Sequence, residues 1–452
     1  MFETLTNFVV AKTLAREWWR SDAFWTSAFL NHWPFNIIPY LIDRWALKRS
    51  TYWSREQLDA LTETRLAHLC ARAAQIPFWK KVFLQQPHTG KTYREYLSQL
   101  PVISRSDFKT LPIETYCDRT LLTTSLRDRT SGSTGVPFTF FLDRGTLLAL
   151  WAIRDRQCYV ASRGIRYPLV IFRADIHLQK RFHKPHFVYL RGYHDVAERF
   201  GALEEKLMKR APHGAVLYMF PSSAVALGRF MEETGKTLPL KALVATGESV
   251  PPEMRAYIEK TLGAPVALAY GSQESSCIAF ECERGSMHIN EEDLLVEIVD
   301  AEGKPLPDGV EGKVVVTHLG YRVMPFIRYH NGDQGTIGVN ACLCGRTLKT
   351  ITITGRTPTL ISHHDGYTLT LTEVSVLFNE YANAVQLFQI VHKSPDCIHV
   401  YVVPGPEYAE EKERLAARLA RKLHPETHLT IEEVAHIETS ASGKMRYYVR
   451  EF

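Results

Sequence analysis

The stretch Leu238-Pro-Leu-Lys-Ala-Leu-Val-Ala245 is an apolar run of strand length that leads directly into Thr246-Gly-Glu-Ser249. Similar runs occupy residues 169–172, 215–219 and 266–269, and helical stretches separate them. Short apolar runs that alternate with helices are typical of buried strands in a layered α/β domain. We therefore predict the α/β class for the centre of the chain.

The segments on either side of this centre have different patterns. Residues 1–105 contain a predicted helix over residues 55–83. Residues 279–350 hold short strand-like runs between Gly and Pro turns, and residues 385–434 have the order strand, strand, helix, strand. We predict a large multi-layer domain over residues 1–355, with a helical layer at 1–105 and a β-rich part at 279–350. A small, mobile α+β domain would follow over residues 356–452.

The composition is that of an ordinary globular protein. Among the 452 residues, 45% are hydrophobic and 23% are charged, which excludes a disordered chain or a fibre. The net charge of +5 is small for this length, so we expect no nucleic-acid partner. The sequence has no secretory signal and no long apolar run, and its eight cysteines are too few for a disulfide scaffold. We therefore expect a cytoplasmic protein without a transmembrane segment.

Tryptophan is concentrated near the N-terminus. Seven of the eight tryptophans lie in the first 79 residues, at Trp18, Trp19, Trp25, Trp33, Trp45, Trp53 and Trp79. One interpretation is a helical layer that packs on a larger core. The other is an exposed aromatic patch that contacts a membrane surface or a second copy of the chain, which makes a homodimer possible.

Residues 129–137 have the sequence Arg-Thr-Ser-Gly-Ser-Thr-Gly-Val-Pro. Glycine lets backbone N–H groups approach an anion closely, and Ser and Thr hydroxyls donate further hydrogen bonds, so this composition suits a triphosphate. The segment is not a Walker A loop, because it lacks Gly-Lys-Ser/Thr. By itself it also fits an ordinary flexible loop.

Five short motifs in fixed order resemble the signatures of the adenylate-forming superfamily. They are residues 130–135, Thr246-Gly-Glu-Ser249, Tyr270-Gly-Ser-Gln-Glu274, Phe326-Ile-Arg-Tyr-His-Asn-Gly-Asp333 and Ser442-Gly-Lys444. The chain most resembles the branch of phenylacetate–CoA ligases, which includes capsule-biosynthesis homologues. This resemblance implies that ATP activates a carboxylic acid as an acyl-adenylate with release of pyrophosphate, and that the acyl group then passes to coenzyme A or another acceptor.

The resemblance also implies residue roles. Lys444 would place its charge between the carboxylate and the α-phosphate, and Glu274 would hold Mg²⁺. Asp333 would accept hydrogen bonds from the ribose hydroxyls, and Arg356 would belong to the hinge between the domains. The ATP phosphates and the adenine would contact Thr130, Ser131, Gly132, Ser133, Thr134, Gly135, Gly247, Glu248, Tyr270 and Gly271.

Two rival interpretations stay open. An adenylyltransferase would place AMP on a small-molecule hydroxyl and would not need coenzyme A. A catalytically silent ATP-binding scaffold would act through the Trp-rich N-terminal region. Lys444 argues against a silent scaffold, which has no need of this residue.

The hinge between the two predicted domains departs from the usual pattern of the family. Thr357, Pro358 and Thr359 follow Arg356 at positions that are normally acidic.

A cysteine and histidine cluster indicates a metal site. Cys282, His288, Cys342 and Cys344 supply three thiolates and one imidazole, a tetrahedral donor set for structural Zn²⁺. Buried free cysteines are the alternative, and Cys277 is a competing ligand. Some phenylacetate–CoA ligase relatives are similar in carrying a Cys/His zinc site in this region. We predict one structural zinc ion per chain.

Overall fold

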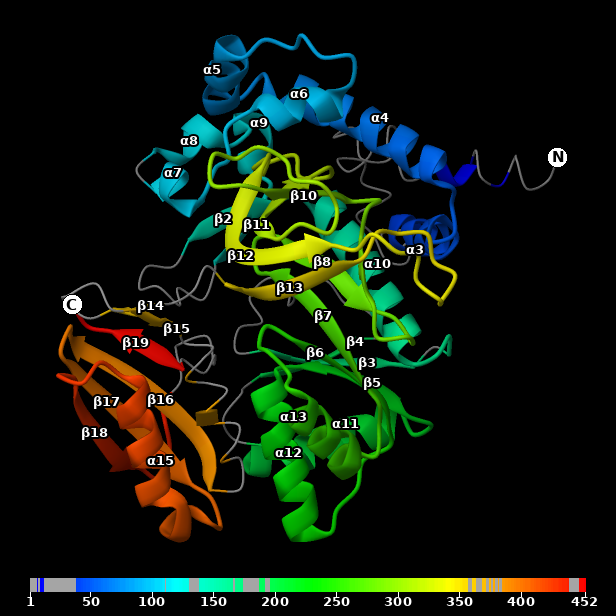
Figure 1. Ribbon diagram of the computed structural model, residues 1–452. Coiled ribbons are helices and arrows are strands. Elements are labelled where there is room, and N and C mark those ends of the chain that lie inside the picture. Colours follow the sequence, from blue (N-terminus) through cyan, green and yellow to red (C-terminus); the bar gives the residue numbers. More distant parts are fainter. Residues whose placement is uncertain are drawn as a thin grey trace. The chain divides into compact units, whose positions relative to one another are not determined.

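The computed structural model divides the chain into two compact units, whose elements are labelled in Figure 1. One unit ends at Thr354 and the other runs from Gly355 to Phe452. The described residues are 6, 9–11, 38–109, 111–129, 138–165, 167–173, 187–191, 196–356, 360–362, 368–370, 374, 377–378, 381, 384–438 and 447–452. No helix among these residues has the length and apolarity needed to span a membrane.

The centre of the first unit is a seven-stranded sheet in the order β4-β3-β5-β6-β7-β8-β9. The strands from β4 to β7 are parallel, and β8 and β9 are antiparallel additions. The apolar runs of the sequence form its middle, as predicted: β3 (Leu169–Arg173), β5 (Ala215–Met219), β6 (Leu240–Thr246) and β7 (Val266–Ser272). The other strands are β4 (Phe187–Arg191), β8 (Ser276–Glu281) and β9 (Met287–Ile289).

Helices cover both faces of this sheet. Because side chains alternate along a strand, Val216 and Tyr218 of β5 face one core, and Leu217 faces the other. The core around Leu217 contains residues of α11 (Val196–Arg210), α12 (Pro221–Thr234) and α13 (Pro252–Leu262). The core around Val216 contains residues of α10 (Arg144–Ala161) and of the N-terminal helices. The α/β class predicted for this region is therefore confirmed.

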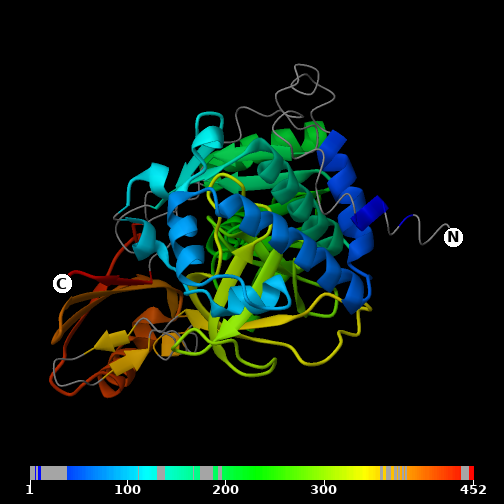
Figure 2. The same cartoon turned by 90° about the horizontal axis from the view of Figure 1, so that it is seen from above.

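The N-terminal layer is helical, and its blue helices lie on the outside of the first unit in Figure 2. Its helices are α3 (Ile38–Ser50), α4 (Arg55–Ala73), α5 (Pro77–Gln85), α6 (Tyr93–Gln99), α7 (Arg105–Lys109), α8 (Ile113–Tyr116) and α9 (Arg119–Leu122). The single helix predicted over residues 55–83 is wrong in one respect, because α4 and α5 are separate. Ile76 is extended before Pro77, which has no N–H to continue the α4 hydrogen bonds.

Two of the N-terminal tryptophans pack in the core of the first unit. Trp79 is fully buried and meets Phe78 edge-on at a ring distance of 5.0 Å, and Trp53 is also buried. These two residues therefore agree with the interpretation that the Trp-rich region packs on a larger core. The other interpretation, a membrane-surface or homodimer contact, depends also on four tryptophans that lie outside the described residues: Trp18, Trp19, Trp25 and Trp33.

The first unit also contains the predicted β-rich part. A four-stranded sheet has the order β10 (Leu294–Val299), β11 (Gly312–His318), β12 (Tyr329–Ile337) and β13 (Ile351–Arg356). Its core residues pack with Ile278 and Ile289 of β8 and β9. A separate antiparallel hairpin joins β1 (Leu126–Arg129) to β2 (Thr139–Leu142). This hairpin flanks residues 130–138, which contain the predicted phosphate-binding loop.

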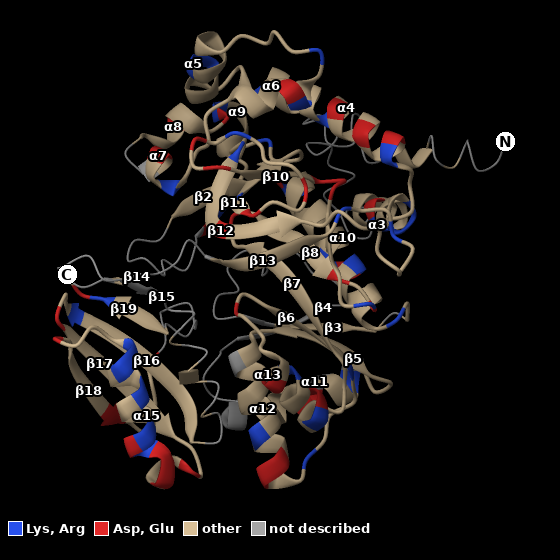
Figure 3. Ribbon diagram, in the orientation of Figure 1, with Lys and Arg blue, Asp and Glu red and all other residues tan. Residues whose placement is uncertain are grey.

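The second unit has its own sheet and core. The sheet order is β18 (His428–Glu433), β17 (Cys397–Pro404), β16 (Val385–Ser394) and β19 (Tyr448–Arg450), and a hairpin joins β14 (Leu360–Ser362) to β15 (Thr368–Thr370). The helix α15 (Tyr408–Lys422) buries Leu415 and Leu419 in this core. Figure 3 shows acidic and basic residues along the same helix, as expected for an amphipathic helix at a surface. The predicted order of strands and helix is therefore present, with β19 added.

Candidate functional site

Three of the five motifs meet in the first unit at the ends of β6 and β7. Thr246 of β6 pairs with Ala269 of β7, so that Gly247 and Tyr270 follow at the same edge of the sheet. Gly247 has a φ of +79°, a left-handed conformation that glycine adopts without steric cost. Glu248 is half-buried beside it. Polar groups at the carboxyl ends of parallel strands are a common place for ligand binding in α/β folds.

Gly271 is required by the hairpin that joins β7 to β8. A Cβ atom at this position would collide with the backbone carbonyl of Ser276 on the opposite strand. The glycine therefore lets the two strands close tightly at their connection. This close approach positions Glu274, which lies in the turn between the two strands.

Glu274 is fully buried and held by several groups. Its Oε1 accepts hydrogen bonds from Arg105 Nη2 at 3.0 Å and from the Tyr329 hydroxyl at 2.9 Å. Its backbone carbonyl accepts a hydrogen bond from the Tyr321 hydroxyl at 2.9 Å. Burial by itself raises the pKa of this carboxyl, but Arg105 and the hydrogen bonds outweigh burial and keep the pKa below its ordinary value. Glu274 is therefore a carboxylate at neutral pH.

The second oxygen of Glu274 is suited to a metal ion. Glu274 Oε2 is buried and has no hydrogen-bond partner among the described residues. An unsatisfied buried carboxylate oxygen is costly unless another group binds it, and Mg²⁺ prefers carboxylate and phosphate oxygens. The residue that the sequence suggests as a Mg²⁺ ligand thus has a free donor atom.

Tyr270 and Asp333 are in direct contact. The Tyr270 hydroxyl donates to Asp333 Oδ2 at 2.8 Å, and Asn331 Nδ2 donates to the same oxygen at 2.9 Å. Asn331 Nδ2 also lies 2.9 Å from the Tyr270 hydroxyl. The three side chains come from β7 and β12, so they join the central sheet to the β-rich part. The contact orients an aromatic ring and a carboxylate toward one region, as a nucleoside with its base and ribose would need.

Several predicted site residues cannot be placed. Lys444 lies outside the described residues, as do the six residues of the phosphate-binding loop from Thr130 to Gly135. Arg356 ends β13, and its side chain is also outside the description. The roles of these residues stay predictions.

The structure brings the four predicted zinc ligands together. The donor atoms of Cys282, His288, Cys342 and Cys344 all lie within 4.8 Å of one another. Cys282 Sγ is 3.7 Å from Cys342 Sγ, and Cys344 Sγ is 3.2 Å from His288 Nε2. Cys277 is not part of this cluster, because its thiol lies 3.3 Å from Gln157 Oε1 in another part of the core. The cluster can hold a metal ion.

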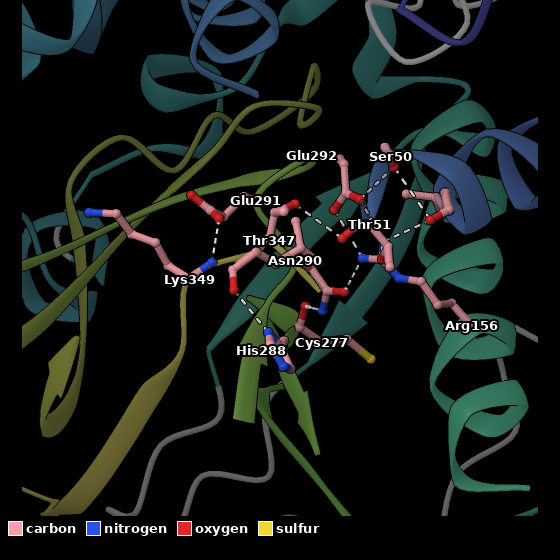
Figure 4. A network of polar contacts seen from close by, with 12 residues as sticks. Ser50, Thr51, Arg156, Cys277, His288, Asn290, Glu291, Glu292, Thr347 and Lys349 are labelled. Atoms are coloured by element: carbon pink, nitrogen blue, oxygen red, sulfur yellow. Dashed lines mark hydrogen bonds and ion pairs between the residues drawn. The ribbon is translucent and has the colours of Figure 1, made fainter. Parts of the chain in front are cut away.

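The surroundings of His288 fit this role. Its Nδ1 lies 2.9 Å from the Leu348 carbonyl oxygen, which favours a proton on Nδ1 and leaves Nε2 available for a metal. Burial lowers the pKa of His288 and so favours the neutral ring. Figure 4 shows His288 beside a buried polar network in which Arg156 donates to Glu292 and to Asn290, the residue that follows β9. Ser50 also donates to Glu292, and Thr51 accepts a hydrogen bond from Arg156. The β9 strand that carries His288 is therefore well anchored.

Sequence reasoning missed some residues of the site. Arg105 lies 169 positions before Glu274, and no local pattern connects the two. Asn331 lies inside a motif that the sequence did reveal, so its contact with Asp333 could have been suspected. Tyr329 lies in the same motif, but nothing in the sequence indicates that its hydroxyl reaches Glu274.

Comparisons with known proteins agree with this fold. The family model described as the CapK C-terminal domain matches residues 361–451. A phenylacetate-coenzyme A ligase from Thermus thermophilus is 26% identical over 360 residues, which cover 75% of this chain and 78% of that protein. The motifs that suggested a phenylacetate–CoA ligase-like chain are thus supported by similarity over most of its length.

Solved structures give the same result. A 2-hydroxyisobutyryl-CoA ligase in the postadenylation state matches with a TM-score of 0.71 at 20% identity, over 89% of this chain and 91% of that chain. An open conformation of the same ligase, in complex with an acyl-AMP and CoA, matches with a TM-score of 0.59 at 20% identity, over 89% of this chain and 95% of that chain. The chain is therefore similar to a phenylacetate-coenzyme A ligase over most of its length, shares its fold with a 2-hydroxyisobutyryl-CoA ligase, and matches the CapK C-terminal domain over residues 361–451.

Proposed function

We propose that this chain is an AMP-forming ligase that activates a carboxylic acid with ATP and transfers the acyl group to coenzyme A. The observation that carries the proposal is the contact of Tyr270 and Asn331 with Asp333, together with the buried carboxylate of Glu274 in the same motif as Tyr270. These groups come from motifs that are far apart in the sequence, yet they share one region of the first unit. The similarity to a phenylacetate-coenzyme A ligase supports the same reaction class.

In the first step, a carboxylate oxygen of the acid attacks the α-phosphorus of ATP. The bond between the α-phosphorus and the oxygen that bridges it to the β-phosphorus breaks. Pyrophosphate leaves with this oxygen, and the acyl-adenylate forms. Asp333 accepts hydrogen bonds from the ribose hydroxyls, and the Tyr270 ring stacks on adenine while its hydroxyl keeps Asp333 oriented. Glu274 would hold Mg²⁺, which would offset the charge of the departing pyrophosphate. Lys444 would supply a positive charge for the negative charge that develops in this step.

In the second step, the sulfur of coenzyme A attacks the acyl carbon, and AMP leaves with its phosphate oxygen. The bond between the acyl carbon and that oxygen breaks as the thioester forms. Crystal structures of a 2-hydroxyisobutyryl-CoA ligase were obtained with an acyl-AMP and CoA together, which supports this order for a protein of the same fold.

A zinc ion and a cytoplasmic location complete the proposal. The Cys282, His288, Cys342 and Cys344 donor set suits a structural Zn²⁺ ion, since the four donor atoms lie within 4.8 Å of one another and three thiolates with one imidazole are a common zinc donor set. None of the eight cysteines forms a disulfide, which is usual in a reducing compartment. We therefore propose that the chain works in the cytoplasm.

Exchange of labelled pyrophosphate into ATP tests the first step. We expect at least one member of a panel of aromatic, fatty and hydroxy acids to support exchange in the presence of Mg²⁺, and coenzyme A to be consumed when it is added. If no acid supports exchange, the ligase proposal fails. Exchange without consumption of coenzyme A would instead favour an adenylyltransferase or another acceptor.

A further inference from the structure

A cavity lies in the first unit, away from the nucleotide residues. It has a volume of about 750 Å³ and is lined by Val266, the first residue of β7. Tyr270 lies four residues further along the same strand, a distance of about 13 Å. Neither Glu274 nor Asp333 lines the cavity. It is therefore separate from the candidate adenylate site.

The cavity walls come from segments that are distant in the sequence. They are the end of α3 with Thr51 and Tyr52, residues 155–164 at the end of α10, the start of β7 with Arg255 of α13, and residues 281–285 with 343–346. The helix α10 packs against both α3 and β8, and Figure 1 shows these elements beside one another. A volume of this size is typical of a small-molecule site.

Positive charge exceeds negative charge in the lining. Seven Lys and Arg residues and three Asp and Glu residues line the cavity, and Figure 3 shows charged residues around α3 and α10. Each of the three acids already pairs with an arginine of the lining. The pairs are Arg44–Asp155 at 3.8 Å, Arg255–Glu281 at 2.8 Å and Arg346–Glu283 at 2.7 Å. Arg156 pairs with Glu292 at 2.6 Å.

Three cations of the lining have no acidic partner within 4.0 Å in the described part of the chain: Lys48, Arg163 and Arg284. The Lys48 ammonium lies 4.8 Å from the centre of the Tyr159 ring, so a cation–π contact holds it at the cavity. The guanidinium groups suit the oxygens of a phosphate group, which they can bind through two parallel hydrogen bonds.

A different use of these cations is to offset the negative ends of helices. Lys48 lies in the last turn of α3, and Arg163 follows the end of α10. A cation at such a position stabilises the helix end. Arg284 lies in the connection between β8 and β9 and has no helix end to offset. The helix ends thus do not account for all three charges.

The cavity also presents aromatic and apolar surface. Tyr52 is 57% exposed and Leu343 is 90% exposed, and both line the cavity. Exposure of an apolar side chain such as Leu343 to water does not stabilise the fold. Exposed apolar groups beside cations suit a ligand that has a charged group and an apolar body.

We propose that this cavity is a second anion site that binds a phosphorylated small molecule with a planar or apolar body. Lys48, Arg163 and Arg284 bind the phosphate, and Tyr52 and Leu343 contact the rest of the ligand. Cys282 and Cys344 of the metal cluster also line the cavity, so the cluster holds the loop that carries Leu343 against the wall.

Calorimetry with two probes tests the proposal on the full chain. Inorganic pyrophosphate measures binding that depends on charge alone. The second probe, 1-naphthyl phosphate, has a planar apolar body in addition to its phosphate group. We expect 1-naphthyl phosphate to bind at one site per chain and more tightly than pyrophosphate. The Asp333→Asn variant, which alters the nucleotide site, is expected to retain this binding.

The decisive variant combines Arg163→Asn with Arg284→Ala. Asn tolerates the φ of +54° at position 163 better than Ala does, so the chain is expected to fold. The control combines Lys236→Ala with Lys260→Ala, which removes the same charge from exposed ion pairs elsewhere. We expect the first double variant to weaken 1-naphthyl phosphate binding at least tenfold and the control to change it less than twofold.

Three outcomes would overturn the second site, and the first two concern binding alone. One is equal binding by both double variants, and the other is loss of 1-naphthyl phosphate binding in the Asp333→Asn variant, which would place the probe in the nucleotide site. A change in stability without a change in binding would assign the cations to the helix ends and would also refute the proposal. Because probe binding and not adenylation is measured, the result does not depend on the proposed ligase activity.

Discussion

The Arg105–Glu274 pair lies between the N-terminal layer and the candidate adenylate site. The guanidinium donates to a carboxylate that is almost completely removed from water, so the cation and the anion each offset the burial of the other. The depressed pKa of Glu274 contributes stability above the pKa of the unfolded carboxyl, and this contribution is lost as pH falls through the folded pKa.

The Arg105→Ala variant should therefore be less stable at neutral pH, by about 3 kcal/mol, because a buried carboxylate loses its partner. The loss should shrink below about pH 4, where the carboxyl is protonated in the unfolded chain. Denaturant unfolding at several pH values measures both effects. Arg94→Ala is the control, since Arg94 pairs with the exposed Asp59 and this pair contributes little. Similar losses in the two variants would contradict the assignment.

Lys444 is the residue on which the chemical step depends most in the proposed reaction. We expect Lys444→Ala to lower the rate of pyrophosphate exchange by a factor of about 100 or more, because a positive charge is lost where negative charge develops. ATP binding, measured by calorimetry, should change little. Lys412→Ala is the control, since Lys412 is a surface residue of α15 whose ion pair with Glu433 is exposed. An unchanged exchange rate in Lys444→Ala would refute the assigned role.

His318 should make the molecule sensitive to acid. The His318 side chain is buried, and its ring stacks on the Tyr321 ring with 3.9 Å between the ring centres. Burial lowers the pKa of His318 to about 4. Between pH 4 and about 6.5 the unfolded chain binds a proton that the folded chain does not, so stability falls as pH falls. The contribution amounts to about 3 kcal/mol across that range.

A His318→Phe variant keeps an aromatic ring and does not titrate. Its free energy of unfolding should depend less on pH in the same range, whatever its absolute stability. The slope of that free energy against pH, measured by denaturant unfolding, is the quantity to compare with the unaltered chain. Equal slopes would show that His318 is not a source of acid sensitivity.

At the scale of elements, the metal cluster connects β8 and β9 to the loop over residues 342–346. We expect one zinc ion per chain in the purified protein, and we expect Cys344→Ser to lose it and to unfold at a temperature lower by about 5–10 °C. Elemental analysis and thermal unfolding measure the two effects. Cys397→Ser is the control, because Cys397 begins β17 and lies outside the cluster. A fully stable, metal-free protein would contradict a structural zinc.

Many elements could be predicted because their patterns are local. The runs that form β5 and β7, and the amphipathic pattern of α15, specify a strand or a helix without help from distant residues. The break between α4 and α5 was visible in Pro77, although the apolar spacing continues past it. The strand β19 has only three residues and forms by parallel pairing with β16, so no local sequence pattern predicts it.

Local sequence patterns predict only part of the candidate site. Tyr270, Glu274 and Asp333 were selected through short motifs, but a motif does not reveal contacts across the fold. Arg328 illustrates this, since its side chain donates to the carbonyls of Ser98 and Gly303 and to Glu297, and so ties the N-terminal layer to the β-rich part. Such contacts depend on how separate elements pack, which the sequence order alone does not specify.

At the scale of the whole molecule, the second unit has what a separate domain needs. Its core combines β16, β17 and α15, and the described core residues all come from this unit. The CapK C-terminal family model covers nearly the same residues. A core of this kind in about 100 residues is enough for independent stability.

We therefore expect a protein consisting of residues 355–452 to fold by itself. Its circular dichroism should show helix and strand, and its thermal unfolding should be cooperative. Val402→Ala within this fragment should lower its stability by about 2–3 kcal/mol, because Val402 is fully buried. A fragment without a cooperative transition would show that the unit depends on the rest of the chain.

The tight hairpin at Gly271 limits how this protein could be redesigned. Since even an alanine would collide with the opposite backbone, we expect variants at this position to fold poorly. The neighbouring Ser272 and Gln273 carry side chains and face no such barrier. Efforts to change the acid that is accepted should keep the glycine and diversify the positions around it.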